Sequence, residues 1–70
     1  MDINDVITYI EKELDVVEPE LIEWDDNRIK FQGILDGEAA EVELLYTNSV
    51  FINGEPRHDI YLPFNVWAVE

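Results

Sequence analysis

Residues 28–45, RIKFQGILDGEAAEVELL, carry the clearest structural signal in the sequence. At the middle of this stretch, Asp36-Gly37 is a strong signal for a two-residue hairpin turn. A turn at this dipeptide pairs four couples of residues: Phe31 with Val42, Ile29 with Leu44, Lys30 with Glu43 and Gln32 with Glu41. The first two couples form an apolar face and the other two form a polar face, as a half-buried antiparallel sheet requires.

A second hairpin is predicted upstream, with its turn at Asp26-Asn27. Its register pairs four more couples: Trp24 with Ile29, Ile22 with Phe31, Glu23 with Lys30 and Asp25 with Arg28. Three strands then share one apolar face. On the polar face, Lys30 is expected between Glu23 and Glu43 in a cross-strand triad that relieves some of the local repulsion.

The C-terminal third of the chain gives weaker signals. The expected elements are a turn near Thr47-Asn48, a strand over residues 50–52, a turn at Asn53-Gly54, a short edge strand over residues 57–62, and a strand or short helical turn over residues 65–70. Phe64 and Trp67 are expected in the core.

The N-terminal segment has the periodicity of an amphipathic helix. Its apolar residues recur at spacings of three and four: Ile3, Val6, Ile7, Ile10, Leu14 and Val17. Asp2 is expected to cap the helix, with Asp5 favourable near its positive end. Pro19 ends the pattern, because the residue before a proline avoids helical angles. We therefore expect a helix at about residues 3–15 and strands from about residue 20 onward. The fold class is α+β, with the helix packed on one face of an antiparallel sheet of four or five strands.

The composition describes a folded domain with a strongly negative surface. The chain has 17 Asp and Glu residues against 4 Lys and Arg, a net charge of -13, yet 47% of its residues are hydrophobic. Disordered acidic tails lack such apolar content, so we expect residues 1–70 to form one acidic domain. Direct nucleic-acid binding needs a basic footprint, which this composition does not provide.

Several features predict a cytoplasmic protein. The chain has no Cys, which fits the cytosol. Asp2 and Asp5 follow Met1 where a signal peptide would carry basic charge. No apolar run is long enough to span a membrane, and anionic lipid headgroups would repel an acidic surface. We therefore expect no membrane partner.

Residues with catalytic or metal-binding chemistry are few. His58 is the only histidine and Ser49 the only serine, and neighbouring strand residues point to opposite faces. The segment 25–27, Asp-Asp-Asn, offers oxygen ligands without the spacing of a calcium-binding loop, and it is typical of a hairpin turn. We predict no catalytic residue, no metal and no cofactor, and therefore a protein that is not an enzyme.

The acidic surface itself is the remaining candidate for function. Glu41 and Glu43 are two residues apart and share one face of a strand, with Glu23 across the sheet and loop acids at the rim. The residues predicted to bind a partner are Glu18, Glu20, Glu23, Asp25, Asp26, Glu41 and Glu43. Four apolar residues are expected on the same outer face: Leu21, Leu45, Val50 and Ile52. Apolar residues within a charged patch are typical of an interface centre.

A plain solubility role is the competing interpretation, because acidic side chains on a small domain are usually solvated. The charge of -13 exceeds the magnitude of about 2–8 that is typical of a small soluble domain. This excess of negative charge favours the interpretation that the electric field of the protein attracts a basic partner. A halophilic-like surface and a small enzyme or metal-binding module stay open as further alternatives.

In its length, its charge, its lack of Cys and its opening residues 1–7, MDINDVI, leading into a helix, the chain resembles the small acidic DNA-mimic inhibitors made by bacteriophages. Targets of that class include uracil-DNA glycosylase, restriction enzymes, CRISPR effectors and the bacterial nucleoid protein HU. Its members share no common fold or motif, so the resemblance carries over no individual residue. It implies an inhibitor, active in the bacterial host cytoplasm, that binds the DNA-binding surface of a basic host protein, with HU favoured.

An immunity or antitoxin protein that masks a basic nuclease toxin is the alternative function. Such a protein would use similar electrostatics, but its affinity would depend on a central aromatic or apolar anchor. The sequence predicts no oligomeric state for either function.

Overall fold

The chain begins with a short helix whose start is fixed by acidic side chains. The computed structural model describes all 70 residues. Helix α1, Ile3–Glu13, has Asp2 as its N-cap, and the Asp2 carboxylate accepts a hydrogen bond from the Asn4 backbone amide at 2.7 Å. The Asp5 carboxylate accepts one from the Asp2 backbone amide at 3.3 Å. This capping box satisfies free amides at the positive end of the helix, so the predicted Asp2 cap is confirmed.

Helix α1 ends at Glu13, two residues before the predicted end at residue 15. Leu14 is its C-cap, and Asp15 then takes a positive φ of 57°, which turns the chain away from the helix axis. After this turn Val16 is buried while Val17 is 58% exposed. The expectation that Val17 completes the apolar stripe of the helix is therefore wrong.

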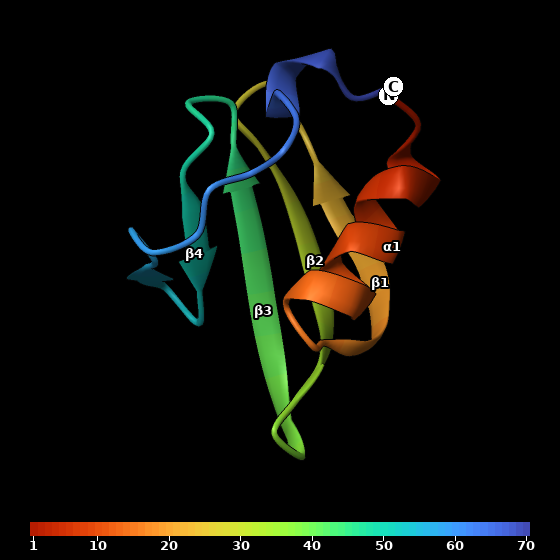
Figure 1. Cartoon of the computed structure of the whole chain (residues 1–70), viewed down its shortest axis with the longest axis vertical. Coiled ribbons are helices and arrows are strands. Elements are labelled where there is room, and N and C mark those ends of the chain that lie inside the picture. Colours follow the sequence, from red (N-terminus) through yellow and green to blue (C-terminus); the bar gives the residue numbers. More distant parts are fainter.

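Five antiparallel strands follow in simple sequence order, β1-β2-β3-β4-β5 (Figure 1). Their bounds are Val17–Trp24 for β1, Arg28–Leu35 for β2, Glu38–Leu45 for β3, Val50–Ile52 for β4 and Glu55–Pro56 for β5. The predicted α+β class is confirmed. The first strand starts at Val17 rather than near residue 20, with Pro19 inside it. An edge strand tolerates proline because its outer amides need no partner strand.

The central hairpin has the register that the sequence predicts. All four couples expected around Asp36-Gly37 are Cα partners between β2 and β3. Asp36 and Gly37 both take positive φ angles, 53° and 80°, as a type I′ turn requires. This turn type matches the right-handed twist of the flanking strands. The dipeptide therefore fixes which residues of β2 and β3 point to each face of the sheet.

The first hairpin departs from its predicted register at one residue. Trp24 faces Ile29 and Glu23 faces Lys30 as expected, but the partner of Phe31 is Leu21 rather than Ile22. The pairing shifts between Leu21 and Glu23, and again between Val17 and Glu20. A β-bulge of this kind inserts an extra residue into one strand. A prediction that assigns alternate residues to alternate faces, counting back from the turn, cannot detect such a bulge.

The fourth strand presents the opposite face from the predicted one. Val50 pairs with Leu44 and Ile52 pairs with Val42, and directly paired residues point to the same side of a sheet. Val50 and Ile52 are therefore buried on the inner face, not placed among the acids of the outer face. Leu45 does lie on the outer face, where it is half-buried beside Arg28.

The last fourteen residues contain little regular structure. The expected edge strand over residues 57–62 is absent, and the edge position is taken by β5. One 3-10 turn, η1, spans Val66–Ala68, which agrees with the short helical turn considered for this region. The segment returns to the N-terminus, where the Glu70 amide donates to the Met1 carbonyl at 2.7 Å. The two chain ends therefore lie side by side (Figure 1).

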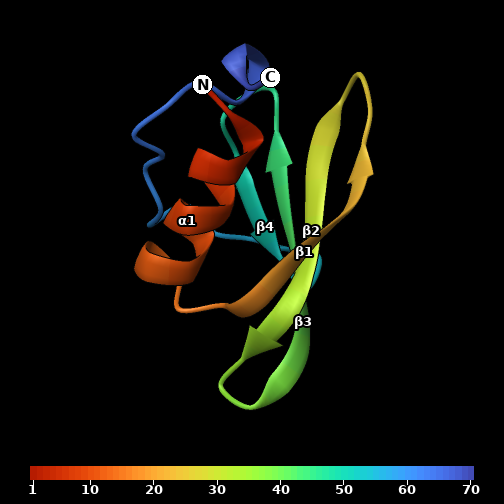
Figure 2. The same cartoon turned by 90° about the vertical axis from the view of Figure 1, so that its right-hand side faces the viewer.

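The molecule has one covered sheet face and one open face. Helix α1 and the C-terminal segment lie on the same side of the sheet, and no element lies on the other side (Figure 2). We call the covered side the inner face and the open side the outer face. Ten residues form the core: Val6, Ile10, Val16, Ile29, Phe31, Val42, Leu44, Val50, Ile52 and Val66.

Phe64 and Trp67 of the C-terminal segment were both expected in this core, but only Phe64 packs against it. Phe64 is half-buried and packs edge-on against Tyr9, with ring centroids 5.4 Å apart. Trp67 is 65% exposed, so its predicted core position is wrong. The reason is that η1 turns the Val66 side chain inward in its place.

Candidate interaction surface

The outer face carries four of the seven residues predicted to bind a partner. The strand pairing places side chains in rows across this face: Val17, Ile34 and Ala39 in the first row, then Glu20, Gln32 and Glu41, then Glu23, Lys30, Glu43 and Phe51, and last Arg28 and Leu45. The prediction that Glu41 and Glu43 share a face with Glu23 is therefore confirmed. Two cations, Arg28 and Lys30, stand in the middle of this acidic group.

Ion pairs occupy most of the carboxylates on the outer face. Lys30 lies 3.1 Å from Glu41 and 4.0 Å from Glu43. Arg28 bonds Glu43 at 3.0 Å and Glu23 at 3.2 Å. The hydrogen bond to Glu43, together with the nearby Glu23 charge, raises the pKa of Arg28. Exposed pairs of this kind stabilise a fold by only about 0–1 kcal/mol each, but they hold these carboxylates in fixed positions.

The predicted triad of Lys30 with Glu23 and Glu43 is wrong for Glu23. Glu23 is the Cα partner of Lys30, but its carboxylate reaches Arg28 instead, while Lys30 reaches Glu41. The guanidinium of Arg28 bridges two strands because its side chain is long enough to contact both β1 and β3. The outer face therefore holds four glutamates against two cations, so it is net negative but not uniformly acidic.

The remaining three predicted residues, Glu18, Asp25 and Asp26, lie together with Glu20 along the β1 edge of the sheet and in the turn that follows it. Glu18, Glu20, Asp25 and Asp26 are exposed, and none of them has a salt-bridge partner. We call these four residues the edge set. Glu18 takes a positive φ of 50° within the first bulge. Each bulge thus shifts which side chains of β1 lie on the outer face.

The turn between β1 and β2 is held by its own side chains. The Asp25 carboxylate accepts hydrogen bonds from the backbone amides of Asn27 at 2.8 Å and Arg28 at 3.1 Å. These bonds, chiefly the one from Asn27, lower the pKa of Asp25. The Trp24 indole donates to the Tyr46 hydroxyl, which in turn donates to the Asp25 carbonyl. The predicted hairpin turn over residues 25–27 is confirmed, and its carboxylate is fixed in place.

Apolar side chains are interleaved with the acids along β1. Val17, Leu21, Ile22 and Trp24 are 58%, 37%, 44% and 40% exposed. Of these, only Leu21 was expected on the outer face, and that prediction is wrong, because Leu21 pairs with Phe31 of the inner face. Pro19 within the strand was the available signal, because proline in a sheet marks an edge or a bulge. An edge strand with two bulges cannot bury its apolar side chains as a central strand does.

Most of the negative charge has no compensation within the chain. Among the 17 acidic side chains, only Glu23, Glu41, Glu43 and Asp59 form salt bridges, and the other 13 form none. Three of the four basic residues take part in those salt bridges. The free carboxylates are therefore exposed to solvent or to a partner.

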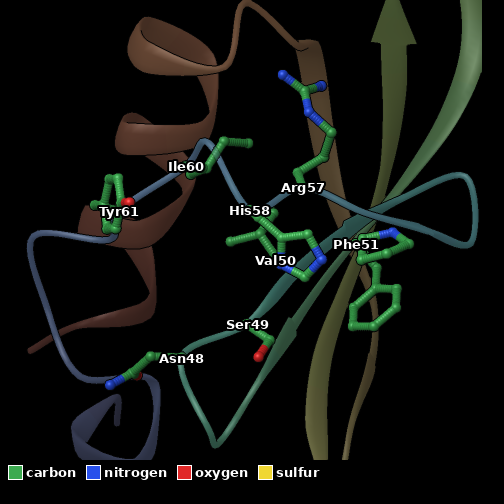
Figure 3. A pocket seen from close by; sticks show the side chains of 9 residues that line it. Asn48, Ser49, Val50, Phe51, Arg57, His58, Ile60 and Tyr61 are labelled. Atoms are coloured by element: carbon green, nitrogen blue, oxygen red, sulfur yellow. The ribbon is translucent and has the colours of Figure 1, made fainter.

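A shallow hollow of about 210 Å³ lies beside β4, between this strand with the turn before it and the segment of residues 56–61 (Figure 3). Its lining includes His58, Ser49, Asn48 and Tyr61. Asn48 is already engaged, since its side-chain oxygen accepts from the Val66 amide at 2.9 Å. Ser49 accepts a hydrogen bond from Thr47 rather than from His58. This arrangement contains no nucleophile hydrogen-bonded to a base.

A second hollow lies where α1 ends beside the β2–β3 turn. It is lined by four acids, Glu13, Asp15, Asp36 and Asp59, together with Arg57. Two hydrogen bonds from Arg57, at 2.9 and 2.8 Å, lower the pKa of Asp59 to about 2. No group of three acidic or imidazole side chains converges closely enough to hold a metal ion.

Comparisons with protein families, with curated proteins and with solved structures gave no match for this chain. The structure contains no helix with the length and apolar character needed to cross a membrane.

Proposed function

We propose that this protein is a non-enzymatic inhibitor that presents acidic side chains to a basic DNA-binding protein and thereby blocks DNA binding. The nucleoid-associated protein HU is the favoured partner, because the length and charge of the chain resemble those of small phage inhibitors. The observation that supports the proposal is the excess of 13 unpaired carboxylates on a folded scaffold. Such a field attracts a cationic surface from a distance and speeds its encounter.

The edge set is the part of the predicted surface best suited to direct contact. Glu41 and Glu43 already bond to Lys30 and Arg28, so a partner's cations would have to compete with those side chains. The edge set has no such competitor and follows a strand of eight residues, which spans roughly 25 Å. That length covers most of one turn of duplex DNA, about 34 Å. The free carboxylates of Glu18, Glu20 and Asp26 can therefore bond Lys and Arg residues that otherwise hold phosphates, whereas Asp25 chiefly holds the turn.

A displacement assay with purified HU tests this function. HU is first bound to fluorescently labelled duplex DNA, and the anisotropy of the DNA is followed as the protein is added. The proposal predicts that the protein releases the DNA, and that release becomes less efficient as salt screens the charges. An unchanged anisotropy at low salt would refute HU as the target.

Two matched triple variants separate direct contact from the overall field. E18Q/E20Q/D26N removes three charges from the edge set, and E11Q/E38Q/E55Q removes three free charges elsewhere. Asp25 is left intact because its carboxylate holds the turn. The edge variant should need at least about tenfold more protein for half-release, since each lost contact is a charge-assisted hydrogen bond. Equal losses in the two variants would show that the edge set has no special role.

The apolar residues of β1 favour one second candidate. Trp24, Ile22 and Leu21 lie exposed among the acids, and an aromatic anchor within a charged patch is what an immunity or antitoxin protein needs. Such a protein would inhibit one basic nuclease. Its affinity would fall with salt as that of a DNA mimic does, but it would also fall strongly with W24A and would be specific to one nuclease.

A further inference from the structure

The turn between β1 and β2 is bonded, on both sides of Asp26, to a single residue of another turn. The Tyr46 hydroxyl donates a hydrogen bond to the Asp25 carbonyl at 2.8 Å, and the Tyr46 backbone amide donates one to the Asn27 carbonyl at 3.2 Å. These two carbonyls belong to the residues immediately before and after Asp26. Asp26 therefore lies in a segment whose backbone is held from both directions by Tyr46.

Tyr46 is itself well fixed. It directly follows β3 and begins the turn to β4, and both turns lie at the same end of the sheet (Figure 1). Its ring is half-buried and packs against the core. Its hydroxyl also accepts a hydrogen bond from the Trp24 indole at 3.2 Å. The hydroxyl therefore uses both its donor and its acceptor capacity, and both bonds lead to the end of β1 and the turn that follows it.

The Asp26 carboxylate gains most from a fixed turn, because it is the free acid of this segment. It is exposed and forms no salt bridge, whereas the Asp25 carboxylate already bonds the backbone of the turn. A charged group on a loose turn loses conformational entropy when it binds, and a turn held in one conformation loses less. Binding groups are also placed more precisely where neighbouring residues are fixed by packing and hydrogen bonds.

We propose that Tyr46 is a positioning residue, which holds the β1–β2 turn in one conformation and thereby sets where the Asp26 carboxylate meets a cation of the partner. The inference rests on the proposed function, in which free carboxylates of the edge set bond Lys and Arg residues of a basic DNA-binding protein. Tyr46 acts through Asp26 and is not itself a contact residue. Its role was not predicted from the sequence, because it depends on a contact between two turns that are far apart in the chain.

NMR spectroscopy of the free chain tests whether Tyr46 holds the turn. Tyr46→Phe removes the hydroxyl and keeps the ring that packs against the core. The Trp24 indole N–H resonance should shift, and the backbone order parameters of residues 25–27 should fall. The Trp67 indole takes no part in these bonds and is the internal reference. Tyr9→Phe is the matched control, since the half-buried Tyr9 ring packs on Phe64 and its hydroxyl forms no hydrogen bond in the chain.

The displacement assay with HU tests whether the held turn matters for binding. Tyr46→Phe should need about fivefold more protein for half-release of the DNA, the effect of losing roughly one hydrogen bond, and Tyr9→Phe should match the wild type. In an Asp26→Asn background, Tyr46→Phe should cause little further loss, because the carboxylate that it positions is already neutral. Circular dichroism establishes that each variant is folded under the conditions of the assay.

A loosened turn, together with a loss of DNA release that disappears in the Asp26→Asn background, supports the proposal. Unchanged Trp24 and turn signals in Tyr46→Phe overturn it, and so does a loosened turn with unchanged release. A loss that persists in full in the Asp26→Asn background also overturns it, because Tyr46 would then act by another route. A wild-type protein that releases no DNA overturns the proposed function and with it the role of Tyr46 in binding, while the spectra of the free chain still establish whether Tyr46 holds the turn.

Discussion

Replacing Gly33 with Ala is expected to destabilise the fold by about 1–3 kcal/mol through overpacking. Gly33 faces Ala40 on the inner side of β2, where the chain passes from α1 into β1. A Cβ at this position would lie 2.5 Å from the Val16 Cγ1 atom and 2.9 Å from the Val17 carbonyl oxygen. The second contact is with backbone, so rotation of a side chain cannot relieve it and β1 must move.

A loss of about 1–3 kcal/mol is a large part of the free energy of unfolding of a domain of this length. At about 0.05–0.15 kcal/mol per residue, the free energy of unfolding of 70 residues is roughly 3.5–10 kcal/mol. Each kcal/mol lost lowers the Tm by about 4–8 °C in small domains. Urea unfolding followed by the fluorescence of Trp24 and Trp67 measures the loss directly, and a thermal melt gives the Tm.

A double-mutant cycle with Val16→Ala assigns the loss to the predicted contact. Shortening Val16 removes the Cγ1 atom that the new Cβ would meet, so the two substitutions together should cost less than the sum of their separate costs. A Gly33→Ala protein with the urea midpoint of the wild type would refute the packing of β1 on β2 described above. Additive losses would show that Val16 is not the obstacle.

Two further predictions concern charge. Raising NaCl from about 20 to about 500 mM should increase the urea midpoint, because screening relieves repulsion among carboxylates that lack cationic partners; a decrease would mean that the outer-face ion pairs dominate stability. Asp59→Asn should remove one pH-dependent contribution to stability. The folded-state pKa of Asp59, about 2, lies below its ordinary value of 3.8, so the wild type gains stability above pH 3.8 and loses it as the pH falls towards 2. Urea midpoints should therefore differ near pH 6 and converge near pH 2, and a constant difference across this range would contradict the assignment.

Local signals were sufficient to predict the centre of the fold. The turn at Asp36-Gly37 fixes the register of β2 and β3, because positive φ at both positions admits only one hairpin geometry. Helix α1 followed from its cap and its apolar spacing. These features depend on residues close together in the sequence, which is why they could be predicted without the structure.

The missed features depend on contacts between distant residues. The bulges in β1 accompany the packing of Val16 and Val17 on Gly33, which no alternation pattern reveals. The C-terminal segment has no period, and it is positioned by bonds such as the one from the Val66 amide to Asn48. The strand register placed the outer-face glutamates correctly, but the reach of Arg28 decided which of them are paired.

Affinity capture from bacterial lysate at low salt, with stepwise salt elution and mass spectrometry, tests the proposed function most directly. The wild-type protein should retain one dominant basic DNA-binding protein that duplex DNA displaces, whereas E18Q/E20Q/D26N should retain much less of it. A spread of ribosomal and other basic proteins without enrichment would contradict specific mimicry and would leave the charge with a solubility role.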